Sequence, residues 1–487
     1  MKTLLQVLSQ EERAQVHERT LRILAGTGVR VDSAQGRKIL GDAGAELDEA
    51  ARRVRLPRDL VEASLRCAPR TFTLGARRPD FDLHMNAGDC VLLADGEATC
   101  LLDGVSGKLR PAGFADWLEA TRLIDALDEV GVYWSMVAGG LGDGSQADLV
   151  KYWRHLFANF SKHIQDSTSR AAQAPWLLEV MQVVFGDREA IRRRRPLSFV
   201  LCPQSPLILD ETYTDAYLAL LGWEIPVAVM PMPLMGSTAP ANLIATTLLG
   251  NCEVLAMLCL VQAAAPGTPF VYAPCLARMN PRSGGYGGGA IEQGLLAAAA
   301  TEMARYYDLP AQAAGIVTDH YVPGIQASYE RALNGLLPTL AWPDILVGPG
   351  VLGGATVLSL EQLLLDVEVF RSCKRARRGI ATDAGAWLED VIQRVGPGGH
   401  FLLEDSTLEA IRGNPAQPGE EPEWYISELG VHTTLEQWQA AGEPSLLDEV
   451  HRQVVETLAT HEPLPLAPEA ERELDRIQKR CAETAQR

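Results

Sequence analysis

The sequence lacks several residue patterns that mark familiar kinds of site. None of its nine histidines falls in an HxH or HExxH pattern, the spacings at which imidazoles share a zinc ion. None of its nine cysteines forms a CxxC pair, and several lie within apolar runs, where buried reduced thiols are expected. The sequence therefore gives no sign of a His or Cys metal site or of a disulfide framework, although carboxylates brought together by folding could still bind a metal.

Features of membrane and secreted proteins are also missing. No apolar run approaches the roughly 18–20 residues that span a membrane. The N-terminus turns charged at Glu11, Glu12 and Arg13, which is unlike a signal peptide. A formal net charge of −18 argues against nucleic acid as the main partner. With 487 residues, 47% of them hydrophobic, the chain can bury a large core, so we expect a soluble, cytoplasmic protein.

What the sequence does contain is a repeated alternation of a short apolar run with a long amphipathic stretch. About eight such units predict an α/β fold, a (β/α)₈ TIM barrel. The expected strands are residues 99–103, 131–136, 163–166, 197–201, 226–230, 269–272, 311–316 and 345–348. The expected helices are residues 114–127, 147–160, 172–186, 211–222, 240–265, 290–307, 325–341 and 359–370.

The pattern divides the chain into three parts. Residues 1–97 are predicted to form an accessory segment of helices and a β-hairpin packed on the barrel. Residues 91–102 are interpreted as a hairpin that turns at Asp95, Gly96 and Glu97, so that the first barrel strand follows the turn. The barrel is assigned to residues 98–370, and a helical C-terminal extension to residues 371–487.

The barrel prediction also locates the site, because barrel enzymes place their active sites at the C-terminal ends of the strands. None of the seven lysines lies at such an end, which disfavours a Schiff-base mechanism. Asp319 and His320 directly follow a strand and are the candidate catalytic pair. The candidate substrate-binding residues are Trp134, Gln165, Asp166, Gln204, Met232, Tyr272, Tyr286, Thr318 and Tyr321, with Met230 and Met235 as further possible contacts.

A barrel opening lined by these residues suits an organic cation, since aromatic rings attract cations and one or two carboxylates offset the charge. A glycine-rich run, residues 284–289, precedes an expected helix. It could hold an anion on backbone N–H groups, or it could form a loop that closes over the mouth.

Several stretches of the chain resemble the trimethylamine methyltransferase family, in particular its pyrrolysine-free, glycine betaine methyltransferase-like branch. The likeness extends over nearly the whole chain. Its motifs are residues 24–31 and 68–74, residues 232–240 and 251–255, Thr318-Asp319, Gln326-Ala327, Tyr329-Glu330 and the distinctive run Val395-Gly396-Pro397-Gly398-Gly399-His400-Phe401-Leu402.

The resemblance implies a barrel enzyme that transfers a methyl group from a quaternary or other methylated amine to the Co(I) corrinoid of a separate protein. The corrinoid is then supplied by that partner, and this chain binds no cofactor tightly; we also expect a homo-oligomer. The sequence departs from the family at His320 and Tyr321, at Val347, where many members have a histidine, and at Ser406. Two other functions stay open at this point: a metal-free lyase or isomerase that uses Asp319 and His320 as an acid–base pair, and a non-catalytic binder of methylated amines.

Overall fold

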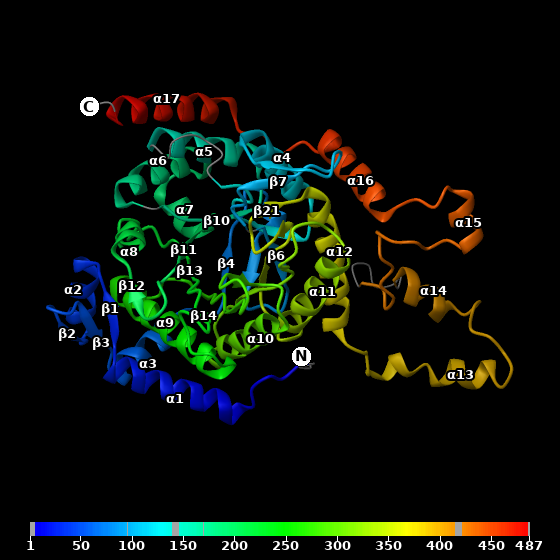
Figure 1. The fold of residues 1–487 in the computed structure, drawn as a ribbon, viewed down its shortest axis with the longest axis horizontal. Helices are drawn as coiled ribbons and strands as arrows, with labels where there is room; N and C mark the ends of the chain where they lie inside the picture. The colour runs from blue at the N-terminus through cyan, green and yellow to red at the C-terminus, as the bar shows by residue number, and fades with distance from the viewer. Residues whose placement is uncertain (1–4, 95, 139–145, 169, 414–420, 486–487) are drawn as a thin grey trace.

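A closed parallel β-barrel forms the centre of the molecule in the computed structural model, which describes residues 5–94, 96–138, 146–168, 170–413 and 421–485 (Figure 1). Within these residues an eight-stranded sheet has the order β15-β13-β11-β10-β9-β6-β19-β18, and a parallel bridge between Tyr272 and Ala311 joins its two ends. The strands are β6 (Val91–Leu93), β9 (Val130–Tyr133), β10 (His163–Asp166), β11 (Leu197–Leu201), β13 (Val227–Val229), β15 (Phe270–Tyr272), β18 (Gln312–Ala314) and β19 (Ile345–Val347). The predicted (β/α)₈ fold is confirmed.

The first strand of the barrel differs from the prediction. The strand expected at residues 99–103 corresponds to β7 (Cys100–Leu102), which pairs with β8 (Leu109–Pro111) and β21 (Val357–Leu358) outside the barrel. The first barrel strand is instead β6, between β9 and β19. The predicted hairpin over residues 91–102 is therefore wrong, because β6 and β7 belong to different sheets; its Asp95 lies outside the described residues. Both strands bury leucines, but β6 places Leu92 and Leu93 on the two sides of the barrel wall, whereas β7 turns back at once and pairs antiparallel with β8.

Because side chains alternate along each strand, the hydrophobic core has one part inside the barrel and another between the barrel and the helices. Val200, Ala228 and Val271 point into the barrel and pack together, whereas their strand neighbours face the helices. Small inward side chains suit the narrow interior of an eight-stranded barrel.

Helices surround the barrel (Figure 1). They are α4 (Phe114–Ala126), α5 (Gln146–Asn159), α6 (Ala174–Phe185), α7 (Arg188–Arg194), α8 (Glu211–Leu218), α9 (Leu243–Ala264), α10 (Ile291–Tyr306), α11 (Ile325–Leu340) and α12 (Leu360–Arg378). Contrary to the sequence expectation, α9 is long and apolar enough to cross a membrane by length and composition alone. Its most apolar window is 78% buried within the protein, as in the core helix of a barrel.

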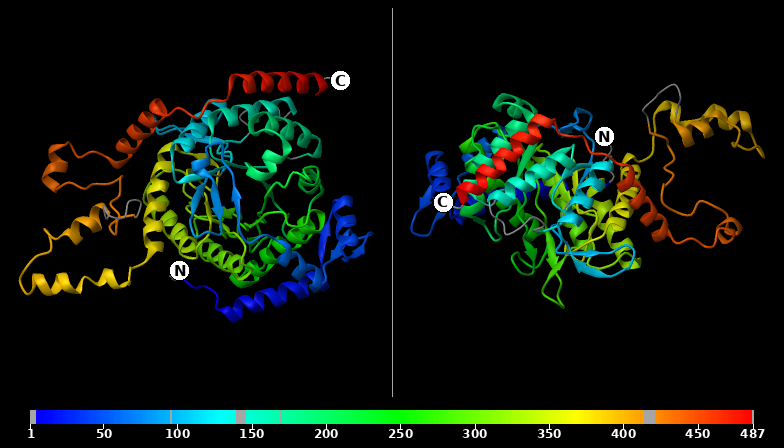
Figure 2. Two further views of the ribbon diagram at one scale, coloured as in Figure 1. Left: turned by 180° about the vertical axis from the view of Figure 1, so that it is seen from behind. Right: turned by 90° about the horizontal axis from the view of Figure 1, so that it is seen from above.

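The N-terminal segment covers one side of the barrel and the end at which the barrel strands begin. Helices α1 (Gln10–Gly26) and α3 (Arg58–Cys67) pack on α9, and α2 (Ala34–Asp42) lies beside a small sheet of β1 (Val29–Val31), β2 (Glu46–Asp48), β3 (Arg53–Arg55) and β12 (Ile208–Leu209). The hairpin of β4 (Phe72–Leu74) and β5 (Leu83–Met85) inserts Leu74 and Met85 into the inner core. Figure 2 shows this hairpin in front when the molecule is seen from behind. It closes the N-terminal end of the barrel.

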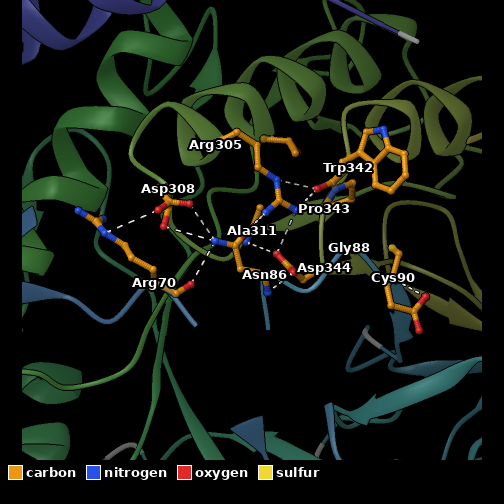
Figure 3. Close-up of polar contacts among 12 residues, drawn as sticks. Arg70, Asn86, Gly88, Cys90, Arg305, Asp308, Ala311, Trp342, Pro343 and Asp344 are labelled. Atoms are coloured by element: carbon orange, nitrogen blue, oxygen red, sulfur yellow. Dashed lines mark hydrogen bonds and ion pairs between the residues drawn. The ribbon is translucent and has the colours of Figure 1, made fainter. Parts of the chain in front are cut away.

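A polar network fixes the chain at this closed end (Figure 3). Asp344, just before β19, accepts hydrogen bonds from the backbone N–H groups of Asn86 (2.5 Å) and Ala311 (2.8 Å). Arg305 of α10 lies 3.3 Å from the same carboxylate and donates to the carbonyl of Trp342 at 2.9 Å. The network ties the approach to β6 to the starts of β18 and β19, and a network at the N-terminal ends of barrel strands serves stability.

The C-terminal extension begins as an arm beside the barrel and then returns to it (Figures 1 and 2). The arm carries α13 (Glu389–Val395), α14 (Asp405–Arg412) and α15 (Leu435–Ala440). After it, α16 (Leu446–Thr460) packs on α4 and α12, and α17 (Pro468–Ala485) packs on α5 and α6.

Candidate active site

A cavity of about 520 Å³ lies at the C-terminal mouth of the barrel. Its volume is in the range of small-molecule sites. The lining residues follow or end all eight strands of the described barrel, so the fold brings together segments far apart in the sequence. They are Gly96, Glu97, Trp134, Ser167, Val200, Cys202, Tyr213, Met230, Met232, Cys275, Tyr286, Ala314, Val317, Thr318, Val347, Val351, Gly354 and Ala355.

Glu97 supplies the charge of this cavity. It follows β6, and its backbone N–H donates to the carbonyl of Ser135 at 2.9 Å, which extends the pairing of β6 and β9 beyond the strands. Its φ of 47° is in the left-handed region, which costs a residue with a side chain on the order of 1–3 kcal/mol. The surrounding protein partly desolvates the carboxyl and raises the pKa of Glu97. Glu97 was not among the predicted site residues, because the sequence pattern placed it in a hairpin turn.

Aromatic and sulfur-containing side chains form much of the remaining wall. Trp134 and Met230, both predicted site residues, are half-buried and pack on the inner core. Tyr286, also predicted, has its hydroxyl 3.8 Å from the Cys275 sulfur. Met232 lines the cavity while staying exposed to solvent. These residues make an apolar wall with π faces and polarisable sulfur.

Asp166 lies behind this wall. It ends β10, and one of its carboxylate oxygens accepts a hydrogen bond from Ser167 N–H at 2.7 Å. Burial is the main cause that raises its pKa to about 7, and the charge of Glu97 adds to the shift. Gln165, its neighbour, is buried below the cavity and donates to the Ser198 hydroxyl at 3.4 Å. Neither side chain is part of the lining.

Asp319 and His320 are also placed outside the lining. Asp319 Oδ1 accepts a hydrogen bond from Gly289 N–H at 3.0 Å, and its own N–H donates to Glu330 of α11 at 3.0 Å. Burial raises the pKa of Asp319. The Nδ1 atom of His320 lies 2.8 Å from the carbonyl of Val322 in its own loop. Thr318, which does line the cavity, donates its hydroxyl hydrogen to Glu330.

Four further predicted residues lie in other surroundings. Tyr272 points outward and donates to Asn251 of α9 at 2.8 Å, and Asn251 also donates to Thr20 of α1 at 2.8 Å. Tyr321 is exposed and lies against Gly353, where an added Cβ would meet its ring at 2.4 Å. Gln204 forms a backbone bridge with Ile208. Met235 pairs with Arg278 between β14 (Leu234–Met235) and β16 (Ala277–Met279).

The glycine-rich run belongs to a β-hairpin. Strand β17 (Tyr286–Gly287) pairs antiparallel with β16, and the turn between them is closed by the Asn280 N–H, which donates to Gly285 O at 2.8 Å. Gly289 lies so close to Glu330 that an added Cβ would be 2.3 Å from its carboxylate. The hairpin sets Tyr286 on the cavity wall, while Asp319 fastens its base.

A buried ion pair positions the loops that follow β18 and β19 at the cavity. Arg331 of α11 contacts Asp366 of α12 with both side chains fully buried. Asp366 accepts from Gly350 N–H at 2.6 Å, and Arg331 donates to the carbonyls of Ile316 (2.6 Å) and Val351. These contacts position the segments that carry Val317 and Val351 into the cavity. Among the described residues, no group of three or more His, Cys, Asp or Glu side chains is arranged to hold a metal ion.

Comparison with known proteins identifies the class. The family model described as "Trimethylamine methyltransferase (MTTB)" matches residues 2–485, so the chain belongs to this family of methyltransferases.

Curated relatives cover nearly the whole chain. The trimethylamine methyltransferase MttB of Desulfitobacterium hafniense strain DSM 10664 / DCB-2 is 29% identical over 94% of this chain and 90% of its own. The glycine betaine methyltransferase of Desulfitobacterium hafniense strain Y51 is 27% identical over 96% of this chain and 95% of its own. The monomethylamine methyltransferase MtmB of Methanosarcina barkeri, a solved structure, is 12% identical over 92% of each chain, with a TM-score of 0.48.

Proposed function

We propose that this protein transfers a methyl group from a quaternary or other methylated amine to the Co(I) corrinoid of a separate carrier protein. The observation that carries the proposal is Glu97, a carboxylate held in a left-handed backbone conformation in a cavity whose other lining residues are uncharged or weakly acidic. Such a cavity favours a cation over a neutral or anionic ligand.

The cavity residues then have three tasks. Glu97 offsets the charge of the ammonium group, and the rings of Trp134 and Tyr286 present π faces to it. The apolar wall of Val200, Val347 and neighbouring side chains excludes water and fixes the direction in which the methyl group points. A quaternary ammonium leaves as a neutral amine when its methyl carbon is attacked, so this step requires no general acid in the cavity.

The carrier supplies the Co(I) nucleophile when it docks. A corrinoid ring does not fit within a filled barrel core, so the carrier has to approach the open mouth. Met232 and Tyr286, which line the cavity and stay exposed, are the rim residues nearest such an approach. Asp319 acts in this account as a positioning residue, because it anchors the base of the hairpin that carries Tyr286.

Methyl transfer to free reduced cobalamin tests the proposal. The protein is incubated anaerobically with cob(I)alamin and a set of methylated amines, and the demethylated amine is measured. Corrinoid-dependent loss of one methyl group is expected. Turnover without corrinoid would favour a lyase or isomerase, and binding without any reaction would favour a non-catalytic binder.

We also propose that the chain assembles with copies of itself through the arm. Within the described part of the arm, residues 379–413 and 421–445, ten large apolar side chains are 45–82% exposed: Ile380, Trp387, Ile392, Phe401, Leu402, Leu403, Trp424, Ile426, Val431 and Leu435. At roughly 150 Å² for a large apolar side chain they expose on the order of 800 Å². This is about the area that one partner buries in a stable interface, and a monomer rarely leaves so much apolar surface in water.

We propose, in addition, that the protein is located in the cytoplasm. None of the nine cysteines, all of which lie in described parts of the chain, forms a disulfide bond, which suits a reducing compartment.

A further inference from the structure

We infer that the cavity selects methylated ammonium compounds whose only charge is the ammonium group, and that it discriminates against zwitterions carrying a carboxylate. The inference rests on the proposed function and narrows its substrate class. It places specificity in Glu97 and in the absence of a cationic partner among the described lining residues.

The inference begins from the ionisable residues that line the cavity. Among the described residues that line it, Glu97 is the only Asp or Glu and there is no lysine, arginine or histidine. The lining also contains the phenols of Tyr213 and Tyr286 and the thiols of Cys202 and Cys275, and burial raises the pKa of Tyr213. In the sequence, positions 95, 139–145 and 169 contain no basic residue either.

Arg278, which lies on the hairpin that carries Tyr286, is already paired. Arg278 of β16 lies beside the segment that carries Tyr286, but its Nε is 3.2 Å from the Glu292 carboxylate. Arg331 is fully buried against Asp366 and two backbone carbonyls. Freeing either side chain for a ligand would leave its acidic partner without its counter-charge.

A carboxylate on the substrate would therefore lose its hydration without gaining an ion pair with a basic side chain of the protein. It would also be repelled by Glu97, and by Asp166 where that buried carboxyl is ionised. Val347 and Val351 offer it no hydrogen bond. A hydroxyl or alkyl group has no such penalty, because Ser167, Thr318 and Tyr213 can serve a neutral polar group and the valines an apolar one.

A matched pair of ligands tests the inference by calorimetry. Glycine betaine and glycine betaine amide share the trimethylammonium group and nearly the same size, but only the first carries a carboxylate. The amide is expected to bind at least about tenfold more tightly than the betaine, with choline and tetramethylammonium on the amide's side. In Glu97→Gln both ligands should bind more weakly than to the parent protein or equally well, and the preference for the amide should shrink, because only the betaine is relieved of the repulsion between its carboxylate and Glu97.

A second variant adds a basic side chain to the cavity lining, which has none among its described residues. Met232→Lys places a positive charge at the exposed rim, where folding should tolerate it, and should improve binding of the betaine relative to the amide. Equal or tighter binding of glycine betaine by the unaltered protein would overturn the inference.

An assay of methyl transfer distinguishes a wrong prediction of charge selection from a wrong proposed function. If the protein demethylates glycine betaine to cob(I)alamin faster than the monocations, the proposed function stands and the charge selection is wrong. If the monocations bind preferentially but none transfers a methyl group, the selection stands and the proposed reaction is wrong. If no methylated ammonium binds, both are wrong.

Discussion

The carboxylate of Asp319 and the backbone N–H of Gly289 form a 3.0 Å hydrogen bond between two loops at the barrel mouth. Asp319 follows β18, and Gly289 ends the segment that carries Tyr286 to the cavity wall. The bond explains how a titratable residue at a strand end can serve a site whose cavity it does not line.

Replacing Asp319 should therefore act through the hairpin. In Asp319→Ala the Gly289 N–H loses its acceptor, so we expect hydrogen exchange in residues 284–289 to increase and the KM for the amine to rise severalfold. Asp319→Asn keeps an acceptor oxygen at the same place and should behave nearly like the parent protein. If the alanine and asparagine variants lose activity to the same large extent while exchange stays unchanged, Asp319 acts on the substrate through its charge.

The affinity for a cationic amine should depend on pH through Glu97. Burial raises the pKa of this carboxyl, so its negative charge is lost as pH falls, at a higher pH than for an ordinary glutamate near 4.3. Binding should be strongest at neutral pH and weaken as pH falls through the raised pKa. Bound cation should in turn lower that pKa.

Glu97→Gln is the control for this profile. It should bind the amine about tenfold more weakly at neutral pH, roughly 1.4 kcal/mol, and show a flatter pH dependence in calorimetric titrations between about pH 5 and 8. A variant with the same slope as the parent would assign the titration to another group, of which Asp166 is the first to examine.

Removing Asp344 should lower stability without changing the chemistry. Asp344→Ala leaves the N–H groups of Asn86 and Ala311 without their acceptor at the closed end of the barrel. We expect the free energy of unfolding to fall by about 2–4 kcal/mol in urea titrations. Asp80→Ala, which breaks an exposed pair with Arg78, should cost less than about 1 kcal/mol. Equal losses in the two variants would show that the network contributes no special stability.

The arm should control the state of assembly. Light scattering of the full chain is expected to give a multiple of the 52.8 kDa monomer. Leu402→Ser with Leu403→Ser, two of the most exposed apolar side chains of the arm, should shift the protein toward the monomer. Val105→Ser, an exposed apolar residue outside the arm, is the control and should not. A monomeric parent protein, or an unchanged mass in the double variant, would contradict the proposal.

Most of the barrel could be predicted from sequence because its strands are short apolar runs separated by helices at regular spacing. Seven of the eight barrel strands lie within or overlap the predicted ranges: β9, β10, β11, β13, β15, β18 and β19. The first strand could not be separated from β7, since both are short and apolar and only the three-dimensional pairing shows which one closes the barrel.

The site was harder to predict than the fold. Trp134, Met232 and Thr318 were predicted because they follow strands, and they line the cavity together with Tyr286 of the glycine-rich run. Tyr272 has the same sequence signal, but alternation along β15 does not tell which of its two faces is inside. Glu97 carried a usable signal, an acidic residue shortly after the apolar run 91–94, and it was missed when that run was assigned to a hairpin.

The most direct test of the central claim follows an isotopically labelled methyl group. A quaternary amine with ¹³C-methyl groups is incubated with the protein and cob(I)alamin under anaerobic conditions, and both products are observed by NMR. The account predicts that label appears on the corrinoid in amounts equal to the demethylated amine, and that Glu97→Gln slows this transfer. Demethylation with no label on the corrinoid, or label transfer at the same rate in Glu97→Gln, would contradict it.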